Sequence, residues 1–100
     1  MSNVLSSLTK SGIKSAYPSA THHKGKAYYA AQRVIDLHIT HTSAAESLIK
    51  AQVQGTTLYT VSIRIQNTKH TIRLDGDCSC PLKHDCKHVV AALLQAVDHN

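Results

Sequence analysis

The chain has 100 residues, enough for one small domain whose core benefits from a metal ion or another cross-link. It contains no Trp and no Phe, so the core has to be built from Val, Ile, Leu, Ala and the four tyrosines. No apolar run approaches the ~18–20 residues of a membrane-spanning helix, and the N-terminus lacks the apolar segment of a secretion signal. These features argue against a membrane protein or an exported one.

The formal net charge of +5 is concentrated in the first third of the chain. The residues after position 33 contain six Lys/Arg and six Asp/Glu and are neutral overall. A basic segment is typical of proteins that bind nucleic acid or another polyanion, although a small domain also uses net charge for solubility. Residues 1–33 contain no Asp or Glu, and their basic residues are Lys10, Lys14, Lys24, Lys26 and Arg33.

Two helices are expected in this N-terminal segment. Residues 8–17 have apolar positions at helical spacing, and Pro18 ends the pattern. Ser19 is suited to cap a second helix that runs to Ala31.

Four segments then alternate apolar and polar residues, which predicts half-buried β-strands. In the first strand Ile35, Leu37 and Ile39 should share the buried face. We expect turns at Asn67-Thr68 and at Asp75-Gly76, with the last strand ending near Leu74. The outer polar face, most simply a solvated face without a partner, is predicted to carry Lys50, Gln52, Gln54, Thr60, Ser62, Arg64, Gln66, Thr71 and Arg73.

Four potential metal ligands lie within residues 78–88: Cys78, Cys80, Cys86 and His88, spaced C-x-C-x5-C-x-H. Zn²⁺ prefers four tetrahedral ligands, and three thiolates with one imidazole complete that shell. No position remains for water or substrate. The spacing therefore predicts a structural zinc site.

Other uses of these residues fit less well. The odd number of cysteines excludes a complete disulfide framework, and one disulfide with a free thiol would suit an exported protein better. A catalytic zinc site would need an open position and a nearby carboxylate, but Glu46 is the only glutamate. His84 and His99 are the competing histidines, and the tight spacing to Cys86 favours His88.

A helix is predicted over residues 86–97, so that it begins with the last two ligands. Val89, Leu93 and Val97 recur every fourth residue and give it a wide apolar face. Cys86 and His88 would lie in its first turn, where the helix dipole favours a thiolate.

These elements predict an α+β fold: a small antiparallel four-stranded sheet with N-terminal helices and a C-terminal helix pinned by a structural zinc knuckle. The whole chain, 1–100, is expected to be one domain. It consists of a basic helical lead-in (1–31), antiparallel strands (34–74), and the zinc knuckle with the C-terminal helix (78–97).

The ligand pattern resembles the SWIM zinc-finger family. The resemblance is carried by Cys78-Ser79-Cys80-Pro81 and by Cys86-Lys87-His88-Val89-Val90-Ala91. Segments upstream, such as Gly25-Lys26-Ala27-Tyr28-Tyr29 and Val53-Gln54-Gly55, are similar to the lead-in of bacterial members. Those members commonly occur in Swi/Snf-type helicase-like ATPases, often near the N-terminus. The resemblance covers about residues 8–97 and implies an accessory role in such machinery.

The functional prediction is a zinc-binding module for nucleic acid, with DNA as the first choice. The alternative is a zinc-stabilised module that docks a protein partner such as a helicase-like ATPase. No phosphate-binding loop and no catalytic set is present, so we expect neither an enzyme nor a small-molecule substrate. Reduced cysteines with zinc indicate the cytoplasm. The residues predicted to bind nucleic acid are Lys10, Lys14, Lys24, Lys26, Arg33, Lys83 and Lys87.

Overall fold

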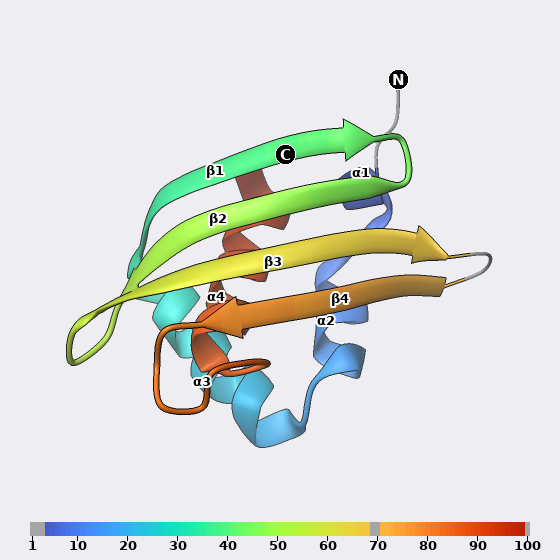
Figure 1. The fold of residues 1–100 in the computed structure, drawn as a ribbon. Coiled ribbons are helices and arrows are strands. Elements are labelled where there is room, and N and C mark those ends of the chain that lie inside the picture. Colours follow the sequence, from blue (N-terminus) through green and yellow to red (C-terminus); the bar gives the residue numbers. More distant parts are fainter. Residues whose placement is uncertain (1–3, 69–70, 100) are drawn as a thin grey trace.

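The computed structural model describes residues 4–68 and 71–99 of the chain. Its four strands form one antiparallel sheet in the order β1-β2-β3-β4, and the helices lie on one side of that sheet (Figure 1). This arrangement confirms the predicted α+β class. The elements are α1 (Val4–Ser7), α2 (Lys10–Ala16), α3 (Ser19–Ala30), β1 (Val34–Ser43), β2 (Glu46–Gln54), β3 (Leu58–Thr68), β4 (Thr71–Cys78) and α4 (Lys87–His99). None of the described helices is long and apolar enough to cross a membrane.

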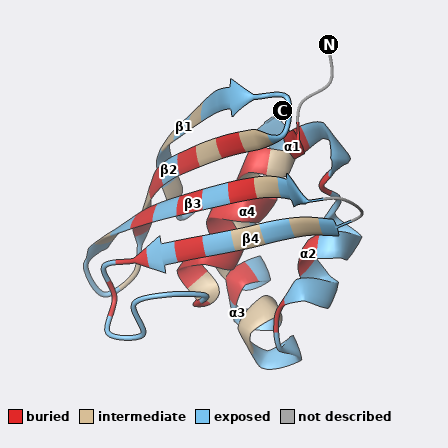
Figure 2. Cartoon of the chain, turned by 45° about the vertical axis from the view of Figure 1, so that its right-hand side comes forward, coloured by how far each residue is buried: buried red, intermediate tan, exposed pale blue. Residues whose placement is uncertain are grey.

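Helix α4 lies at the centre of the molecule, between the sheet on one side and α3 and α2 on the other (Figure 2). Every residue from His88 to Leu94 is buried. On the side away from the sheet α4 packs closely against α3, since a Cβ on Gly25 would lie only 2.5 Å from Val90 Cβ. The wide apolar face of the C-terminal helix is therefore buried against both layers.

The inner face of the sheet supplies the other half of the core. Ile49, Val61, Ile63 and Ile65 are almost completely buried against α4 and α1. The outer face is polar, as the alternation predicts. Its arginines form ion pairs with carboxylates, and the paired atoms are Arg64 Nε with Glu46 Oε1 at 3.5 Å and Arg73 Nε with Asp75 Oδ2 at 3.2 Å.

The prediction that Ile35 faces the core is wrong. Asp36 has a left-handed backbone conformation with φ of 51°, and the register with β2 shifts between Ile35 and His38. Such a bulge moves the preceding residues to the opposite face. Ile35 consequently lies opposite Gln52 on the outer face and is 41 % exposed.

Two predicted turns are also wrong, because strands continue through them. Asn67-Thr68 belongs to β3, and Thr68 pairs with Thr71. Asp75-Gly76 lies inside β4, where Gly76 pairs with Ile63. Gly76 is required by packing, since a Cβ there would lie 2.5 Å from Val89 Cγ1 on α4. The strand therefore reaches the first cysteine directly.

The N-terminal helices begin at other residues than predicted. In place of one helix over 8–17, α2 begins after Thr9, whose Oγ1 accepts a hydrogen bond from the N–H of Gly12 at 2.9 Å. In α3 the cap position is occupied by Pro18, which offers no side-chain hydrogen bond, and Ser19 is the first helical residue.

We expect Gly76→Ala to destabilise the fold by about 1–3 kcal/mol, because the added methyl group overlaps Val89 in a closely packed interface. Thermal or urea unfolding of the metal-loaded protein measures this change. Gly12→Ala is the matched control, since its methyl group would lie 3.3 Å from Thr9 Oγ1 on an exposed helix. There the substitution should change stability by no more than about 1 kcal/mol. Equal stability of Gly76→Ala and the wild type would contradict the packing described here.

Candidate metal centre

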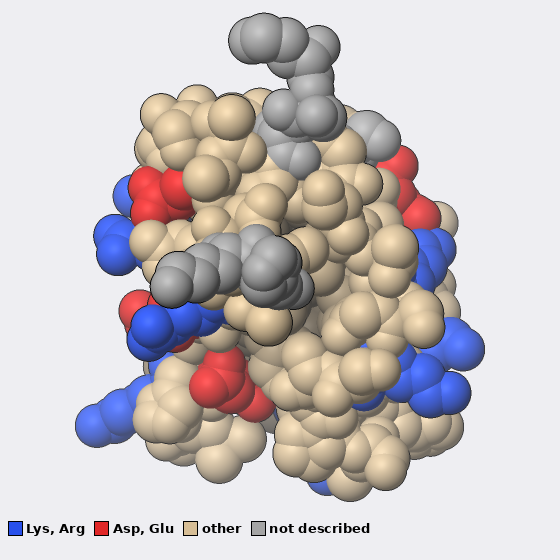
Figure 3. All heavy atoms as spheres, turned by 90° about the vertical axis from the view of Figure 1, so that its right-hand side faces the viewer, with Lys and Arg blue, Asp and Glu red and all other residues tan. Residues whose placement is uncertain are grey.

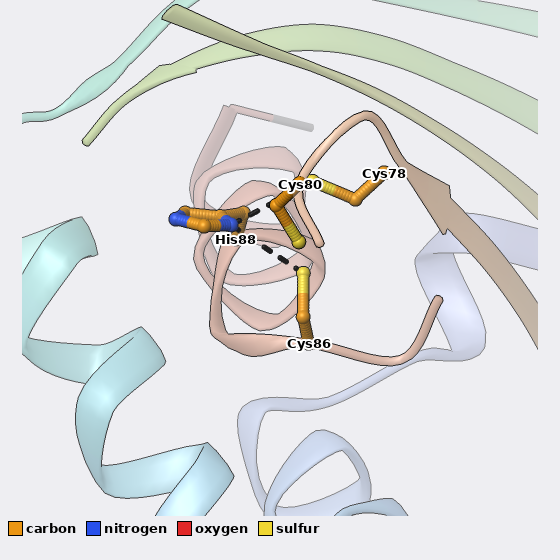
Figure 4. Close-up of side chains that lie close together, drawn as sticks. All are labelled: Cys78, Cys80, Cys86 and His88. Atoms are coloured by element: carbon orange, nitrogen blue, oxygen red, sulfur yellow. Dashed lines mark hydrogen bonds between the residues drawn. The ribbon is translucent and has the colours of Figure 1, made fainter. Parts of the chain in front are cut away.

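The four predicted ligands come together at the end of β4 that meets the start of α4 (Figure 4). Cys78 is the last residue of β4, Cys80 lies in the following loop, and Cys86 and His88 flank the first residue of α4. All four are buried, and their ligand atoms lie within 4.8 Å of one another. The strand and the helix thus deliver ligands to one point.

The loop between the two ligand pairs folds back onto β4. The N–H of Cys78 donates to Lys83 O at 2.6 Å, and the N–H of Asp85 donates to Gly76 O at 3.2 Å. Lys83 and Asp85 have left-handed backbone conformations, with φ of 69° and 49°. These bonds return the chain to the strand end, so that Cys86 faces Cys78.

Two distances within the cluster match those of a tetrahedral metal shell. With sulfur at ~2.3 Å and nitrogen at ~2.0–2.1 Å from the ion, each sulfur lies about 3.6 Å from the nitrogen. His88 Nδ1 lies 3.6 Å from Cys78 Sγ and 3.5 Å from Cys86 Sγ (Figure 4). Three thiol sulfurs and one imidazole nitrogen therefore suit a tetrahedral ion in their chemistry, and the histidine nitrogen is spaced for it from two of the sulfurs.

The His88 ring is held by aromatic neighbours on its other side. The Tyr59 ring lies 4.5 Å from it between centroids, tilted by 31°, and Tyr28 meets it edge-on at 5.2 Å. With Nδ1 facing the sulfurs, Nε2 points away from them (Figure 4). Nε2 is buried and has no hydrogen-bond partner among the described residues. Packing between tyrosines, in place of a carboxylate or carbonyl acceptor, fixes the orientation of this ring.

Burial is the largest single influence on the pKa of each of the four ligands, and hydrogen bonds or a nearby charge act beside it. Burial raises the pKa of the Cys78 thiol to about 12 and also raises the pKa of Cys86. Burial acts in the same direction on Cys80, but hydrogen bonds from the backbone N–H of Lys83, the Cys78 side chain and the backbone N–H of Leu82 lower its pKa overall. Burial, with the nearby Lys87 charge, lowers the pKa of His88 and keeps its imidazole neutral, which is the form that binds a metal.

Neither competing histidine belongs to the cluster. His84 is exposed in the loop, where it pairs with Asp77 through the backbone, and His99 is exposed at the end of α4. Sequence reasoning did not find Tyr28 and Tyr59 as neighbours of the histidine ligand. Their positions far upstream carry no local signal of that packing.

The basic residues predicted to bind nucleic acid lie in different surroundings. Lys10 Nζ lies 2.7 Å from Asp98 Oδ1 and donates a hydrogen bond to Tyr29 Oη at 3.2 Å. Its charge is therefore already paired. Lys24 and Lys83 are exposed, the first on α3 and the second in the loop between the ligands.

Lys14 and Lys26 line, together with His22, a pocket of about 520 Å³ between α2 and α3. The same three residues line an adjoining hollow of about 260 Å³. Arg33 and Lys87 lie elsewhere, beside the Tyr28 ring. Among residues 4–68 and 71–99, the predicted basic residues other than Lys10 form no ion pair with a carboxylate.

Residues 59–96 match the family model of the SWIM zinc finger. The match spans most of β3, then β4, the ligand loop and most of α4, and it contains all four ligands. Comparisons with curated proteins and with solved structures gave no significant match. The family and the cluster together point to a bound metal ion.

We expect Cys80→Ser to abolish stoichiometric metal binding, because the shell would lose one of its three sulfur ligands. Order in α4 should fall with it, since metal and folding are coupled in small sites of this kind. Metal content by elemental analysis and helix content by circular dichroism measure the two effects. A chelator should reproduce both in the wild type. His84→Ala, an exposed histidine in the same loop, should retain the metal, and full metal content in Cys80→Ser would rule out this ligand set.

Proposed function

We propose that this chain, whose residues 59–96 carry a SWIM zinc finger, is a zinc-stabilised module that binds nucleic acid, with DNA as the first choice. It would act as an accessory part of a helicase-like ATPase or of other DNA-processing machinery. Bound zinc would supply structural cross-linking through Cys78, Cys80, Cys86 and His88. All four ligand positions are then used by the protein, which favours a binding module over an enzyme.

The observation that carries the proposal is a basic surface on the helices. The described residues before Val34 include no carboxylate, and the structure brings Lys14, Lys26 and His22 around one pocket between α2 and α3. Burial, followed by the charges of Lys14 and Lys26, lowers the pKa of His22. The positive potential of this pocket is what a phosphate backbone would find favourable.

The described part of the sheet offers no comparable group of unpaired positive charges. Its outer arginines, Arg64 and Arg73, are paired with carboxylates. Figure 3 shows basic and acidic atoms side by side at both flanks of one side of the molecule. Unpaired positive charge therefore favours the helical layer as the binding surface.

A protein-docking role is the second candidate, supported by Leu82. This side chain is 67 % exposed in the ligand loop, next to the metal centre. An exposed apolar group on a rigid loop suits a protein interface, which would depend little on salt. In either role the module would require reduced thiols, and we place it in the cytoplasm for that reason.

We expect the zinc-loaded protein to bind fluorescent oligonucleotides with an affinity that falls steeply with salt, measured by anisotropy at low and moderate salt. Single- and double-stranded DNA and RNA should be compared. Lys14→Ala/Lys24→Ala/Lys26→Ala should weaken binding, because fewer phosphates are then neutralised by the protein. The slope of log K against log salt should fall by roughly 0.9 for each duplex phosphate that the variant no longer neutralises.

A matched control removes the same charge from the sheet. Lys50→Ala/Arg64→Ala/Arg73→Ala takes three positive charges from the outer face and should have a smaller effect. Equal reductions in both variants would mean that net charge alone attracts the oligonucleotide. Absence of binding by the wild type at low salt would refute the nucleic-acid proposal and favour docking to a protein.

A further inference from the structure

Two positive side chains share one aromatic ring near the metal centre. Arg33 Cζ lies 5.7 Å from the centroid of the Tyr28 ring, and Lys87 Nζ lies 5.3 Å from it. Both distances are within the ~6 Å at which a cation is attracted to the face of a ring. Arg33 comes from the α3–β1 connection and Lys87 from the first residue of α4. The ring therefore joins cations from two segments far apart in sequence.

The Tyr28 ring itself packs against one of the metal-ligand residues. It packs edge-on against His88, at 5.2 Å and an interplanar angle of 73°. Tyr59 lies against the same histidine, and its hydroxyl is hydrogen-bonded to Thr56 Oγ1 at 2.9 Å. The surface that carries the two cations is thus built directly on the side chain that faces the cluster.

Arg33 is held in place by the end of β2. Its Nη1 donates to the carbonyl oxygen of Gln54 at 3.3 Å, and its own carbonyl oxygen accepts from the N–H of Gln54 at 2.8 Å. A guanidinium has five N–H donors, so one hydrogen bond leaves most of them available. The arginine is oriented while most of its donors remain available for another acceptor.

No acidic group neutralises this pair among the described residues, where ion pairs involve other basic side chains. An aromatic ring attracts a cation weakly and cannot cancel its charge. Two unpaired positive groups around one ring favour an anion, and guanidinium and ammonium groups both bind phosphate.

We propose that Arg33 and Lys87, held on the Tyr28 ring, form a phosphate-binding site for the backbone of a nucleic acid. This inference rests on the proposed function, and it adds the place at which the nucleic-acid strand would pass the metal centre. Tyr28 acts as a positioning residue for the two cations, since its ring already carries them and is not free to stack on a base.

The test compares two variants that each lack one lysine and one arginine. Arg33→Ala/Lys87→Ala should weaken binding of a fluorescein-labelled DNA duplex about tenfold at low salt. It should lower the salt slope by roughly 1.8, the value for two phosphates. Lys50→Ala/Arg73→Ala removes the same charge from the outer face of the sheet and should leave most of the slope intact. Metal content and circular dichroism should match the wild type in both variants.

Two further variants test the role of the ring. Tyr28→Phe keeps the ring and should bind as the wild type does. Tyr28→Leu keeps both cations and removes the ring, and should weaken duplex binding several-fold when it is compared with the wild type at equal metal content, because Tyr28 also packs on His88. In the wild type the Arg33 Nε–H resonance should shift on titration with the duplex, which reports binding at this side chain.

The outcomes separate this site from the broader proposal. If the wild type binds the duplex but Arg33→Ala/Lys87→Ala behaves like the sheet control, the site is refuted and nucleic-acid binding stands. If this variant has a lower metal affinity with an unchanged salt slope, the cations only balance the thiolates, and the site is refuted. If the wild type does not bind duplex or single strand at low salt, nucleic-acid binding fails and the site fails with it.

Discussion

Helix α4 lies between the sheet and α3 and has almost no face that reaches water. A helix that is apolar nearly all round gains stability from burial, but its apolar surface does not determine its rotation or its starting residue. The Cys/His cluster fixes both, because two ligands lie at the start of the helix, one at the end of β4 and one in the loop just after it. The position of every layer packed on α4 follows from that connection.

The close packing around α4 shows why its position has to be fixed. Gly76 and Gly25 let a strand and a helix approach α4 from opposite sides, with Val89 and Val90 filling the space that a side chain would take. A shift of α4 by one residue would place other side chains against these glycines. With no Phe or Trp, the core depends on such close packing of small aliphatic groups. A tetrahedral metal cross-link would add stability that a core of this size supplies poorly.

The parts that sequence predicted are those whose signal is local. The four ligands lie within residues 78–88, and the third strand alternates without interruption, so both could be recognised from spacing alone. Ile35 could not be placed, because its face depends on a bulge at Asp36 that only the pairing with β2 shows. Asp75-Gly76 is typical of a turn, but Gly76 lies within β4, where a larger residue would overlap Val89 of α4. The ion pair of Lys10 with Asp98 joins opposite ends of the chain, so the sequence could not show that the charge of Lys10 is paired.

The metal centre and the basic surface are parts of one arrangement. Of the three arginines, the two on the sheet are paired with carboxylates, and Arg33 lies beside the ring that packs on His88. Lys87 is bracketed in sequence by two ligands, so any ion that fixes Cys86 and His88 also fixes the backbone that carries this lysine. Helix α3 contributes Tyr28 on one side and Lys26 on the other, which links the ring to the pocket beside α2. A buried structural ion can therefore determine where positive charge lies on the surface without itself contacting a bound nucleic acid.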